Sequence, residues 1–380
     1  MPDRATPDRA ADDRFLLRAL ELARAGIALT SPNPCVGAVL VANGEIVGEG
    51  SHTYEGKKHA EILAIEQAGG SARGATLYLN LEPCSHQGRT RPCADAVVAA
   101  GIRRVVCSME DPNPLVAGHG FAKLRAAGIA VEVGGLANEA RKLNEAFAVY
   151  IRHKRPLVTL KSALTLDGKI ALHAPPTIAS RGAIRTDWIT GGPARTHVQQ
   201  LRHESDAILT GIGTVLADDP LLTDRTCLPR RRPLLRVVLD SHLRLPADSR
   251  LAQSANEDVL VISASSDAAK LAVLEKLGIR VAQVPPTADG HIDLNQVLKL
   301  LGQQDILGLL IEGGSHLNTA ALDSGLVDKV WLYIAPKIWG ASAVPFTAAL
   351  NVPVSLGRAE VHRFGEDFAV EAYLQDPYRK

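Results

Sequence analysis

The sequence predicts a protein of two α/β domains, and three observations lead to this prediction. The chain has 380 residues, which is longer than one hydrophobic core usually serves. Apolar runs with the periodicity of helices alternate with short β-type runs, as expected for helices packed on sheets. A basic, proline-ended segment at residues 152–156 interrupts the alternation, so we expect one domain at 13–150 and a second at 151–380.

The composition argues against several classes of partner. Lys and Arg number 42 and Asp and Glu 41, so a net charge of +1 leaves no overall field to hold a nucleic acid or an anionic membrane. No uninterrupted apolar stretch approaches the ~20 residues that a bilayer span needs. Residues 1–12 are charged, contain prolines and lack a signal-peptide pattern, so we expect a disordered tail there. These features predict a cytoplasmic protein that acts on a small molecule.

The elements of the first domain follow in order from the apolar pattern. Apolar residues at helical spacing predict a helix over 13–24, which ends before Gly26 and a proline-rich turn. Two β-type runs at 36–41 and 45–50 flank Asn43-Gly44, a strong hairpin signal. The alternation then continues with helices at 59–68, 94–100, 120–127 and 138–153, and with strands at 75–81, 104–108 and 129–133.

The second domain repeats the alternation. A strand at 157–162 begins directly after Pro156, and a helix is expected at 192–204. Further strands are predicted at 207–210, 236–240, 258–263, 307–312 and 329–334, with helices between them. The continuous apolar run at 306–311 is typical of a strand that helices cover on both faces.

Three short segments of the first domain carry metal-binding residue types. They are His59-Ala-Glu61, Pro83-Cys84 and Pro92-Cys93. One imidazole and two thiolates would leave the fourth tetrahedral position of Zn²⁺ for water, as catalytic zinc requires. Five cysteines, an odd number, favour metal binding in a reducing compartment over a disulfide framework. Cys93 also opens a predicted helix, whose N-terminal dipole would stabilise its thiolate.

This residue set predicts hydrolytic deamination. Zinc lowers the pKa of a bound water toward ~7, and Glu61 can take that proton and deliver it to a leaving nitrogen. The general deaminase signature continues as Pro-Cys-x-x-Cys, whereas eight residues separate Cys84 from Cys93 here. Two alternatives stay open: the two cysteines as buried structural thiols, and His86 as a competing ligand or an ordinary loop residue.

The segments around these residues resemble the bifunctional riboflavin-biosynthesis family, in which a pyrimidine deaminase is joined to a reductase. The matching motifs are Thr30-Ser-Pro-Asn-Pro-Cys-Val-Gly37, Gly48-Glu-Gly-Ser-His52, His59-Ala-Glu61, Glu82-Pro-Cys-Ser-His-Gln-Gly-Arg-Thr90, Pro92-Cys93 and Asp111-Pro-Asn-Pro114. The long gap between the cysteines is typical of that family and unlike cytidine and tRNA adenosine deaminases. The resemblance implies a cytidine-deaminase-like, three-layer α/β/α domain with zinc on His59, Cys84 and Cys93 and with Glu61 as proton shuttle.

Two further polar residues of this domain have open roles. Asn33 can donate and accept at once, which suits the edge of a pyrimidine ring, but an Asn between two prolines also simply forms a turn. His52 is either a substrate contact or a polar residue at the end of a strand.

The resemblance continues through the second domain. It is carried by Lys161-Ser-Ala-Leu-Thr-Leu-Asp-Gly168, Trp188-Ile-Thr-Gly191, Ala207-Ile-Leu-Thr-Gly211, Thr214-Val-Leu-Ala-Asp-Asp-Pro-Leu-Leu-Thr223 and Glu312-Gly-Gly314. It implies a dihydrofolate-reductase-like α/β domain that uses NADPH. A Rossmann fingerprint is lacking, because Leu216 stands where the third glycine belongs. The glycine pair before a predicted helix can present N–H groups to a phosphate, although a plain strand-to-helix turn would use the same glycines.

The resemblance also implies ligand contacts in this domain. The cofactor contacts fall on Ala163, Trp188, Thr214, Asp218, Gly314, Ser315, His316, Leu317, Asn318, Thr319 and Ala320. The substrate contacts fall on Thr186, Arg202, Leu222, Arg225 and Glu312. The two arginines can clamp a phosphate, although a single arginine is more often a solvated charge. Lys161 is a candidate for polarising the sugar carbonyl, or it pairs with an acid. The loop at 173–182 is longer than the family's usual loop.

These inferences together predict two successive reactions. The first deaminates 2,5-diamino-6-(5-phosphoribosylamino)pyrimidin-4(3H)-one to 5-amino-6-(5-phosphoribosylamino)uracil. The second reduces this product with NADPH to 5-amino-6-(5-phosphoribitylamino)uracil. The expected partners are Zn²⁺, NADPH and a small phosphorylated pyrimidine, with no nucleic acid and no membrane, and a homo-oligomer is expected. The alternatives are an active deaminase with an impaired reductase, a nucleic-acid base deaminase, and a non-catalytic protein with structural zinc.

Overall fold

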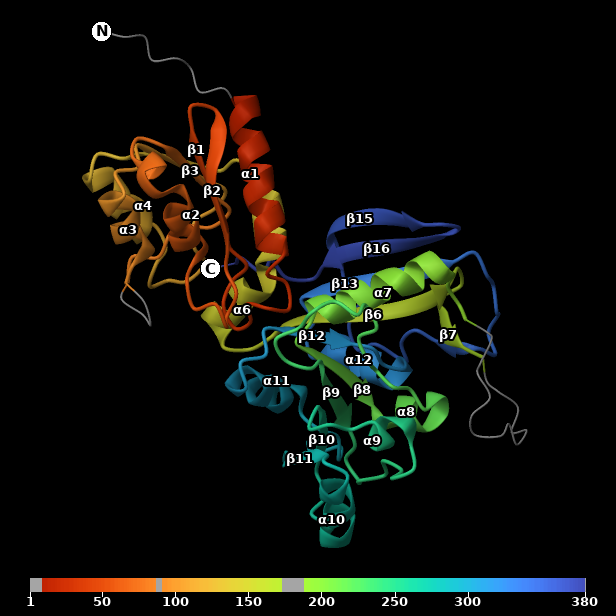
Figure 1. Cartoon of the computed structure of the whole chain (residues 1–380). Coiled ribbons are helices and arrows are strands. Elements are labelled where there is room, and N and C mark those ends of the chain that lie inside the picture. The colour runs from red at the N-terminus through yellow and green to blue at the C-terminus, as the bar shows by residue number, and fades with distance from the viewer. Residues whose placement is uncertain (1–8, 87–90, 173–187, 380) are drawn as a thin grey trace. The chain divides into compact units, whose positions relative to one another are not determined.

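The computed structural model describes residues 9–86, 91–172 and 188–379, and it divides the chain into two compact units (Figure 1). Unit 1 comprises Met1–Lys154 and unit 2 comprises Arg155–Lys380, so the boundary lies four residues beyond the predicted one. The first helix, α1, spans Arg9–Arg24. The expectation of a disordered tail is therefore wrong for residues 9–12, because this segment belongs to an amphipathic helix in which Asp12 is buried. Residues 1–8 lie outside the described residues.

Unit 1 is built on a five-stranded sheet in the order β2-β1-β3-β4-β5. The strands are β1 (Gly37–Ala42), β2 (Glu45–Ser51), β3 (Thr76–Leu79), β4 (Arg104–Cys107) and β5 (Ala130–Val133). The first two strands form the predicted hairpin, and Asn43 and Gly44 both have positive φ angles of 52° and 82°. Positive φ at both central residues is what a type I′ hairpin turn requires, hence the Asn-Gly pair.

Helices cover both faces of this sheet (Figure 1). On one face, Phe15, Leu16 and Ala19 of α1 pack against Val39 and Tyr78 of the sheet. The other face is covered by α2 (Ala60–Ala68), α3 (Cys93–Ala99) and α4 (His119–Ala126), with a 3₁₀ turn, η1 (Gly69–Ala72), after α2. The expected three-layer α/β/α arrangement is confirmed.

The helix predicted over 138–153 is two helices in the structure, α5 (Ala137–Leu143) and α6 (Glu145–His153). The break falls at Asn144, whose φ of −111° is not helical. The side chain of Asn144 accepts a hydrogen bond from Cys35 N at 2.8 Å and donates one to Cys35 O at 3.1 Å. The prediction of one helix is wrong because apolar spacing does not reveal a contact 109 residues away along the chain.

Unit 2 is built on a nine-stranded sheet in the order β11-β10-β9-β8-β12-β6-β13-β16-β15. The strands are β6 (Leu157–Thr165), β8 (Ala207–Gly211), β9 (Leu235–Leu239), β10 (Val259–Ser263), β11 (Arg280–Gln283), β12 (Gly308–Ile311), β13 (Lys329–Ala335), β15 (Gly357–Phe364) and β16 (Asp367–Tyr373). The strands pair in parallel from β11 to β13, and β16 and β15 add an antiparallel edge. A small second sheet pairs β7 (Lys169–Ala171) with β14 (Val344–Pro345).

The strands that the sequence did not predict lie at or near the edges of unit 2. Six of the eight residues of β15 are exposed, so the strand has no alternation of apolar and polar residues to reveal it. The other short strands, β7, β11 and β14, likewise expose or only partly bury their side chains. Burial patterns identify strands that face a core, and these four do not. The sequence also did not predict β16, although four of its seven residues are buried.

Helices cover both faces of the large sheet as well (Figure 1). One face carries α11 (Leu294–Gln303) and α12 (Ser315–Asp323). The opposite face carries α7 (Gly192–Glu204), α8 (Ile212–Asp218), α9 (Arg250–Gln253) and α10 (Ala268–Lys276). Among the described residues, no helix combines the length and hydropathy that a membrane span requires.

Candidate active sites

The predicted metal-binding residues of unit 1 lie at the ends of three elements. His59 is the residue that immediately precedes α2, in an extended conformation, and Glu61 follows in the first turn of that helix. Cys84 lies in the segment after β3, and Cys93 is the first residue of α3. The N-termini of α2 and α3 therefore lie close together, and the side chains of His59 and Cys93 point toward each other.

The three candidate ligands converge. Their ligand atoms all lie within 4.8 Å of one another, with His59 Nδ1 3.1 Å from Cys93 Sγ and 3.6 Å from Cys84 Sγ. An imidazole nitrogen and two thiolates are the donor set that zinc prefers, and three protein ligands leave a position open. His86 is exposed and is not a member of this group. The residues present therefore fit a catalytic zinc ion.

Glu61 lies beside this cluster and is almost completely buried, with 3% of the residue exposed. Within the part of the chain that the structure describes, its Oε2 atom has no hydrogen-bond partner. Burial raises the pKa of Glu61 to about 7. A carboxyl group whose pKa lies near neutrality can both accept and release a proton under working conditions, which is what a shuttle needs.

The two thiols share a hydrogen bond that makes them unequal. The contact with Cys93 lowers the pKa of Cys84, and the same contact raises the pKa of Cys93. The backbone N–H of Cys93, at the N-terminus of α3, donates to Cys84 Sγ at 3.3 Å. The start of α3 thus stabilises a thiolate at Cys84, whereas the sequence led us to expect this effect at Cys93.

Asn33 and His52 are brought together next to His59. The His52 ring donates from Nδ1 to Lys58 O at 2.9 Å, so its Nε2 accepts from Asn33 Nδ2 at 3.0 Å. The rings of His52 and His59 meet edge to face at 5.2 Å. Burial lowers the pKa of His52, which favours this neutral form. His52 therefore fixes the orientation of the Asn33 amide.

Sequence reasoning missed Glu82 as a structural support of this site. Its buried carboxylate accepts three backbone hydrogen bonds, from Asp111 at 3.1 Å, Gly118 at 2.9 Å and Phe121 at 3.1 Å. These bonds hold the loop before α4 next to the Cys84 segment. The only indication of this supporting role in the sequence was the position of Glu82 between the predicted strand at 75–81 and Pro83-Cys84.

In unit 2, three predicted residues form one ionic cluster whose side chains are only 11–14% exposed. Glu312, directly after β12, accepts hydrogen bonds from Arg202 Nε at 2.7 Å and Nη2 at 3.1 Å, and from Lys161 Nζ at 3.3 Å. Burial raises the pKa of Glu312, but Arg202 and Lys161 outweigh it and lower the pKa to about 2. Arg202 also donates from Nη1 to Thr223 O at 2.9 Å. Its guanidinium is thus directed toward the Glu312 carboxylate and the backbone carbonyl of Thr223.

The glycine segment after β12 forms the turn between β12 and α12. A Cβ atom on Gly313 would lie 2.8 Å from the Leu317 side chain, and one on Gly314 would lie 3.8 Å from Thr214 Oγ1. Among the described residues, Ser315 Oγ and Asn318 Oδ1 of α12 are buried without a hydrogen-bond partner. Unpaired polar atoms and backbone N–H groups at a helix N-terminus suit a phosphorylated ligand such as NADPH.

The other predicted contacts of unit 2 differ in exposure. Trp188 is 56% exposed, with the Arg195 guanidinium 5.1 Å from its ring. Ala163 lies half-buried on β6. The Leu222 side chain belongs to the core and its φ is +55°, so a contact with a ligand would use its backbone. The remaining predicted contacts are Asp218, His316, Ala320 and Arg225, which are exposed, and Leu317 and Thr319, which are half-buried. Thr186 and the loop at 173–182 lie outside the described residues.

Two family models match the two units. The cytidine and deoxycytidylate deaminase zinc-binding region matches residues 9–109, and the RibD C-terminal domain matches residues 156–370. The riboflavin biosynthesis protein RibD of Actinobacillus pleuropneumoniae is 46% identical over 370 residues, covering 96% of this chain and 95% of its own. RibD of Escherichia coli K12 is 42% identical, covering 87% of this chain and 89% of its own.

Solved structures agree with these matches. RibD of Acinetobacter baumannii is 36% identical with a TM-score of 0.80, covering 96% of this chain and 99% of its own. A diaminohydroxyphosphoribosylaminopyrimidine deaminase/5-amino-6-(5-phosphoribosylamino)uracil reductase of Thermotoga maritima has the same identity, TM-score and coverage. The similarity spans both units and nearly the whole length of the relatives, and the chain therefore belongs to the RibD family of riboflavin biosynthesis proteins.

Proposed function

We propose that this chain catalyses two successive reactions of riboflavin biosynthesis, a deamination in unit 1 and a reduction in unit 2. The substrate is 2,5-diamino-6-(5-phosphoribosylamino)pyrimidin-4(3H)-one, and the final product is 5-amino-6-(5-phosphoribitylamino)uracil. The observation that carries the proposal is the convergence of His59, Cys84 and Cys93 beside the buried Glu61. The Thermotoga maritima relative, whose name contains both activities, supports the assignment of the two units.

In the deaminase, the residues of unit 1 would hold zinc and move the proton. His59, Cys84 and Cys93 are the three ligands. Bound zinc polarises a water molecule and lowers its pKa. Glu61 accepts the proton of that water at Oε2 and passes it to the leaving amino nitrogen, and a pKa of about 7 suits both transfers. Asn33, oriented by His52, binds the edge of the pyrimidine ring.

In the reductase, the start of α12 would hold the phosphate-bearing part of NADPH through Gly314 and Ser315, with Thr214 beside them. The cofactor supplies a hydride to C1 of the opened ribosyl group. Glu312, held by Arg202 and Lys161, would contact the substrate, and Arg225 would bind the substrate phosphate. The Lys161–Glu312 contact supports the pairing role that the sequence left open for Lys161.

A two-step assay tests this proposal. The purified chain is analysed for zinc and supplied with the diaminopyrimidine, while ammonia release and NADPH oxidation are followed separately. We expect about one zinc per chain, with both ammonia release and NADPH oxidation. Zinc without ammonia release would indicate a structural ion. Ammonia without NADPH oxidation, even with the deaminated intermediate supplied, would contradict the reductase assignment. Ammonia release from single-stranded DNA or from tRNA would instead indicate a nucleic-acid base deaminase.

The assembly and location of the chain stay predictions. We propose a homo-oligomer in the cytoplasm. Size-exclusion chromatography with light scattering checks the first part, and a mass equal to the 40.4 kDa of one chain would contradict it.

A further inference from the structure

The segment between α8 and β9 carries two of the proposed substrate contacts, yet it contains no helix or strand over residues 219–234. Arg225 lies in this segment with an exposed side chain, and its backbone N–H donates to Gln199 Oε1 at 3.0 Å. An arginine that binds a phosphate needs a fixed backbone, because a ligand contact on a loose segment loses both precision and affinity. Other residues must therefore hold the segment in place.

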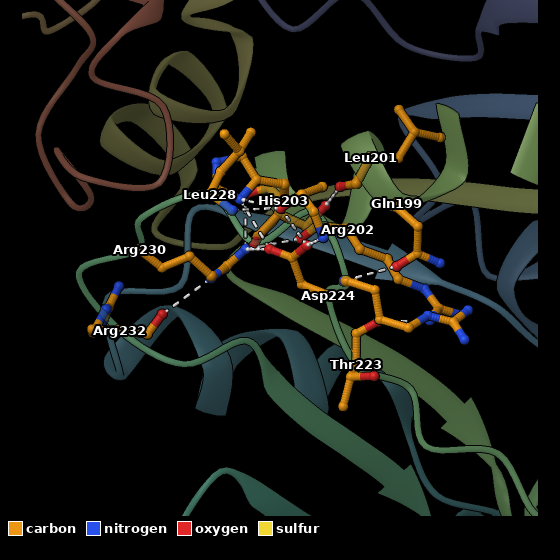
Figure 2. Close-up of polar contacts among 12 residues, drawn as sticks. Gln199, Leu201, Arg202, His203, Thr223, Asp224, Leu228, Arg230 and Arg232 are labelled. Carbon is orange, nitrogen blue, oxygen red and sulfur yellow. Dashed lines mark hydrogen bonds and ion pairs between the residues drawn. The ribbon is translucent and has the colours of Figure 1, made fainter. Parts of the chain in front are cut away.

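The carboxylate of Asp224, next to Arg225, is the buried anchor of the segment (Figure 2). Only 7% of its side chain is exposed. Its Oδ2 atom accepts hydrogen bonds from His203 Nδ1 at 2.9 Å and from Arg230 Nη1 at 3.1 Å. Its Oδ1 atom accepts from the backbone N–H of Thr226 at 2.9 Å and from the Thr226 hydroxyl at 2.7 Å. Four donors thus converge on one carboxylate.

The anchor stays ionised under ordinary conditions. Burial raises the pKa of Asp224, but hydrogen bonds from Thr226, His203 and Arg230 outweigh it and lower the pKa to about 2. A carboxylate that is charged throughout the neutral range keeps all four bonds, and hydrogen bonds to a charged group are the stronger ones.

Arg230 connects the same carboxylate to the end of α7. Its Nη1 atom also donates to Arg202 O at 3.1 Å and to His203 O at 2.9 Å, and its Nη2 atom donates to Ser205 O at 2.7 Å. The last carbonyl groups of a helix lack partners within the helix, and a cation there interacts favourably with the helix dipole. Figure 2 shows Arg230 and Asp224 beside Arg202 and His203. Asp224 is therefore bound to the helix that carries Arg202.

The residues on either side of Asp224 face the same cluster. Arg202 donates to Thr223 O at 2.9 Å and to Glu312 at 2.7 Å. Partial desolvation of this otherwise exposed side chain, and then the neighbouring charge of Arg202, lower the pKa of Arg225, which agrees with two guanidinium groups close to each other. Arg202 is already paired with Glu312, and the exposed Arg225 is therefore the arginine that can present its guanidinium to a phosphate.

We propose that Asp224, with His203 and Arg230, is a positioning unit of the reductase: it holds residues 222–226 against the end of α7, so that Arg225 stands beside Arg202 and receives the substrate phosphate. This inference rests on the proposed reductase function. Asp224 touches neither substrate nor cofactor and acts through Arg225. The phosphate is remote from the carbon that is reduced, so losing its contact weakens the ground state and the transition state alike.

The first test is the variant Asp224→Asn, which keeps the size of the side chain and removes its charge. We expect the reductase KM for the phosphorylated substrate to rise about tenfold, with kcat within about twofold of the wild-type value. The dissociation constant for NADPH and the deaminase kinetics stay unchanged, which shows that both units are folded. The matched control is Asp289→Asn, the same change of charge in an exposed turn. A loss of kcat or of NADPH binding would overturn the proposal.

A double-mutant cycle with Arg225→Ala tests whether Asp224 acts through Arg225. Arg225→Ala alone raises the same KM, and we expect Asp224→Asn to add no further increase in the Arg225→Ala background. If the two effects on KM multiply, the two residues act independently and the positioning role is overturned. Should Asp224→Asn fail to fold, Thr226→Val removes one of the four bonds and is expected to raise KM about threefold.

Limited proteolysis does not depend on enzyme activity, so it tests the positioning role separately from the proposed reductase function. Trypsin cleaves after exposed arginines in loose segments, so the peptide ending at Arg225 should form faster from Asp224→Asn than from the wild-type chain or from Asp289→Asn. Equal rates would overturn the positioning role whether or not the chain is a reductase. A wild-type chain that shows the expected cleavage pattern but oxidises no NADPH contradicts the proposed reductase function instead.

Discussion

Two buried glutamates show how the surroundings of one residue decide its chemistry. Glu61 is buried, and burial raises its pKa to about 7. Glu312 is buried between Arg202 and Lys161, which lower its pKa to about 2. The first carboxyl group can carry a proton at neutral pH, whereas the second is a permanent anion. The same residue type thus suits the proposed proton shuttle in one unit and a fixed charge in the other.

The proton shuttle is tested by Glu61→Gln, which preserves the shape of the side chain. We expect the deaminase turnover to fall at least ~100-fold, because a positioned acid or base contributes two to four orders of magnitude. Zinc content and NADPH oxidation with the deaminated intermediate should be unchanged. If the variant keeps more than about a tenth of the wild-type ammonia release with zinc bound, general acid-base catalysis by Glu61 is wrong.

The fixed charge of Glu312 predicts acid sensitivity of unit 2. Its folded pKa of about 2 lies below the ordinary value of 4.5, so its contribution to stability is complete above pH 4.5 and is lost as the pH falls toward 2. Each group of this kind changes the free energy of unfolding by at most about 1.4 kcal/mol per pH unit. Urea unfolding at pH 5.5 and at pH 3 measures the loss, and Glu312→Gln should show a smaller difference between the two than the exposed control Glu366→Gln.

At the scale of elements, the deaminase site depends on how closely α2 lies on the β1–β2 hairpin. A Cβ atom on Gly50 would lie 2.0 Å from Ala60 O, and one on Gly48 would lie 2.2 Å from Ala64 O. Only glycine lets the helix backbone approach β2 so closely. Because His59 and Glu61 lie at the start of α2, this contact fixes the positions of the proposed zinc ligand and the proposed proton shuttle together.

Gly50→Ala should therefore damage unit 1 and spare unit 2. We expect the inserted methyl group to destabilise unit 1 by about 1–3 kcal/mol, the usual cost of overpacking. The measurement is the temperature at which half of the deaminase activity is lost, which should fall, while the corresponding temperature for the reductase does not change. Gly70→Ala is the matched control, since no atom lies within 4 Å of its added Cβ. Equal inactivation temperatures for both variants would contradict the role of Gly50.

At the scale of the whole molecule, each unit has its own hydrophobic core. The clusters of unit 1 lie on the two faces of the five-stranded sheet, and those of unit 2 lie on the two faces of the nine-stranded sheet. All three tryptophans, Trp188, Trp331 and Trp339, belong to unit 2. Tryptophan fluorescence therefore follows the folding of the reductase unit alone.

Removal of zinc should separate the two activities. A chelator should take the ion from its proposed ligands His59, Cys84 and Cys93 in unit 1, and we expect ammonia release to stop. The urea midpoint reported by tryptophan fluorescence, and NADPH oxidation with the deaminated intermediate, should remain at their untreated values. Restoring zinc should restore ammonia release. A shift of the fluorescence midpoint on chelation would mean that the metal also stabilises unit 2.

The sequence by itself determined the two-unit α/β organisation, most helices and core strands, and the zinc-binding chemistry. The helix at 192–204 and the strands that begin near residues 207 and 330 were predicted because each packs against a core. The pattern of apolar residues within each segment therefore already indicates its secondary structure. His59, Glu61 and Cys84 were identifiable because their residue types already contain the chemistry. The edge strand β15 and the break at Asn144 were not predictable, since one is exposed and the other depends on a distant contact with Cys35.

Only the tertiary structure decided what each charged residue does. The local sequence does not reveal that Arg202 pairs with Glu312 or that Arg225 faces solvent. It also does not reveal that Asp224 is a buried anchor. The partners of these residues lie on α7, after β12 and in the segment between α8 and β9. Arg202 and Glu312, for example, are 110 residues apart along the chain. A charge is inexpensive in water and requires a partner when buried, so its role follows from which side chains the fold places around it. Local sequence patterns record periodicity and residue type, and the fold adds the neighbours.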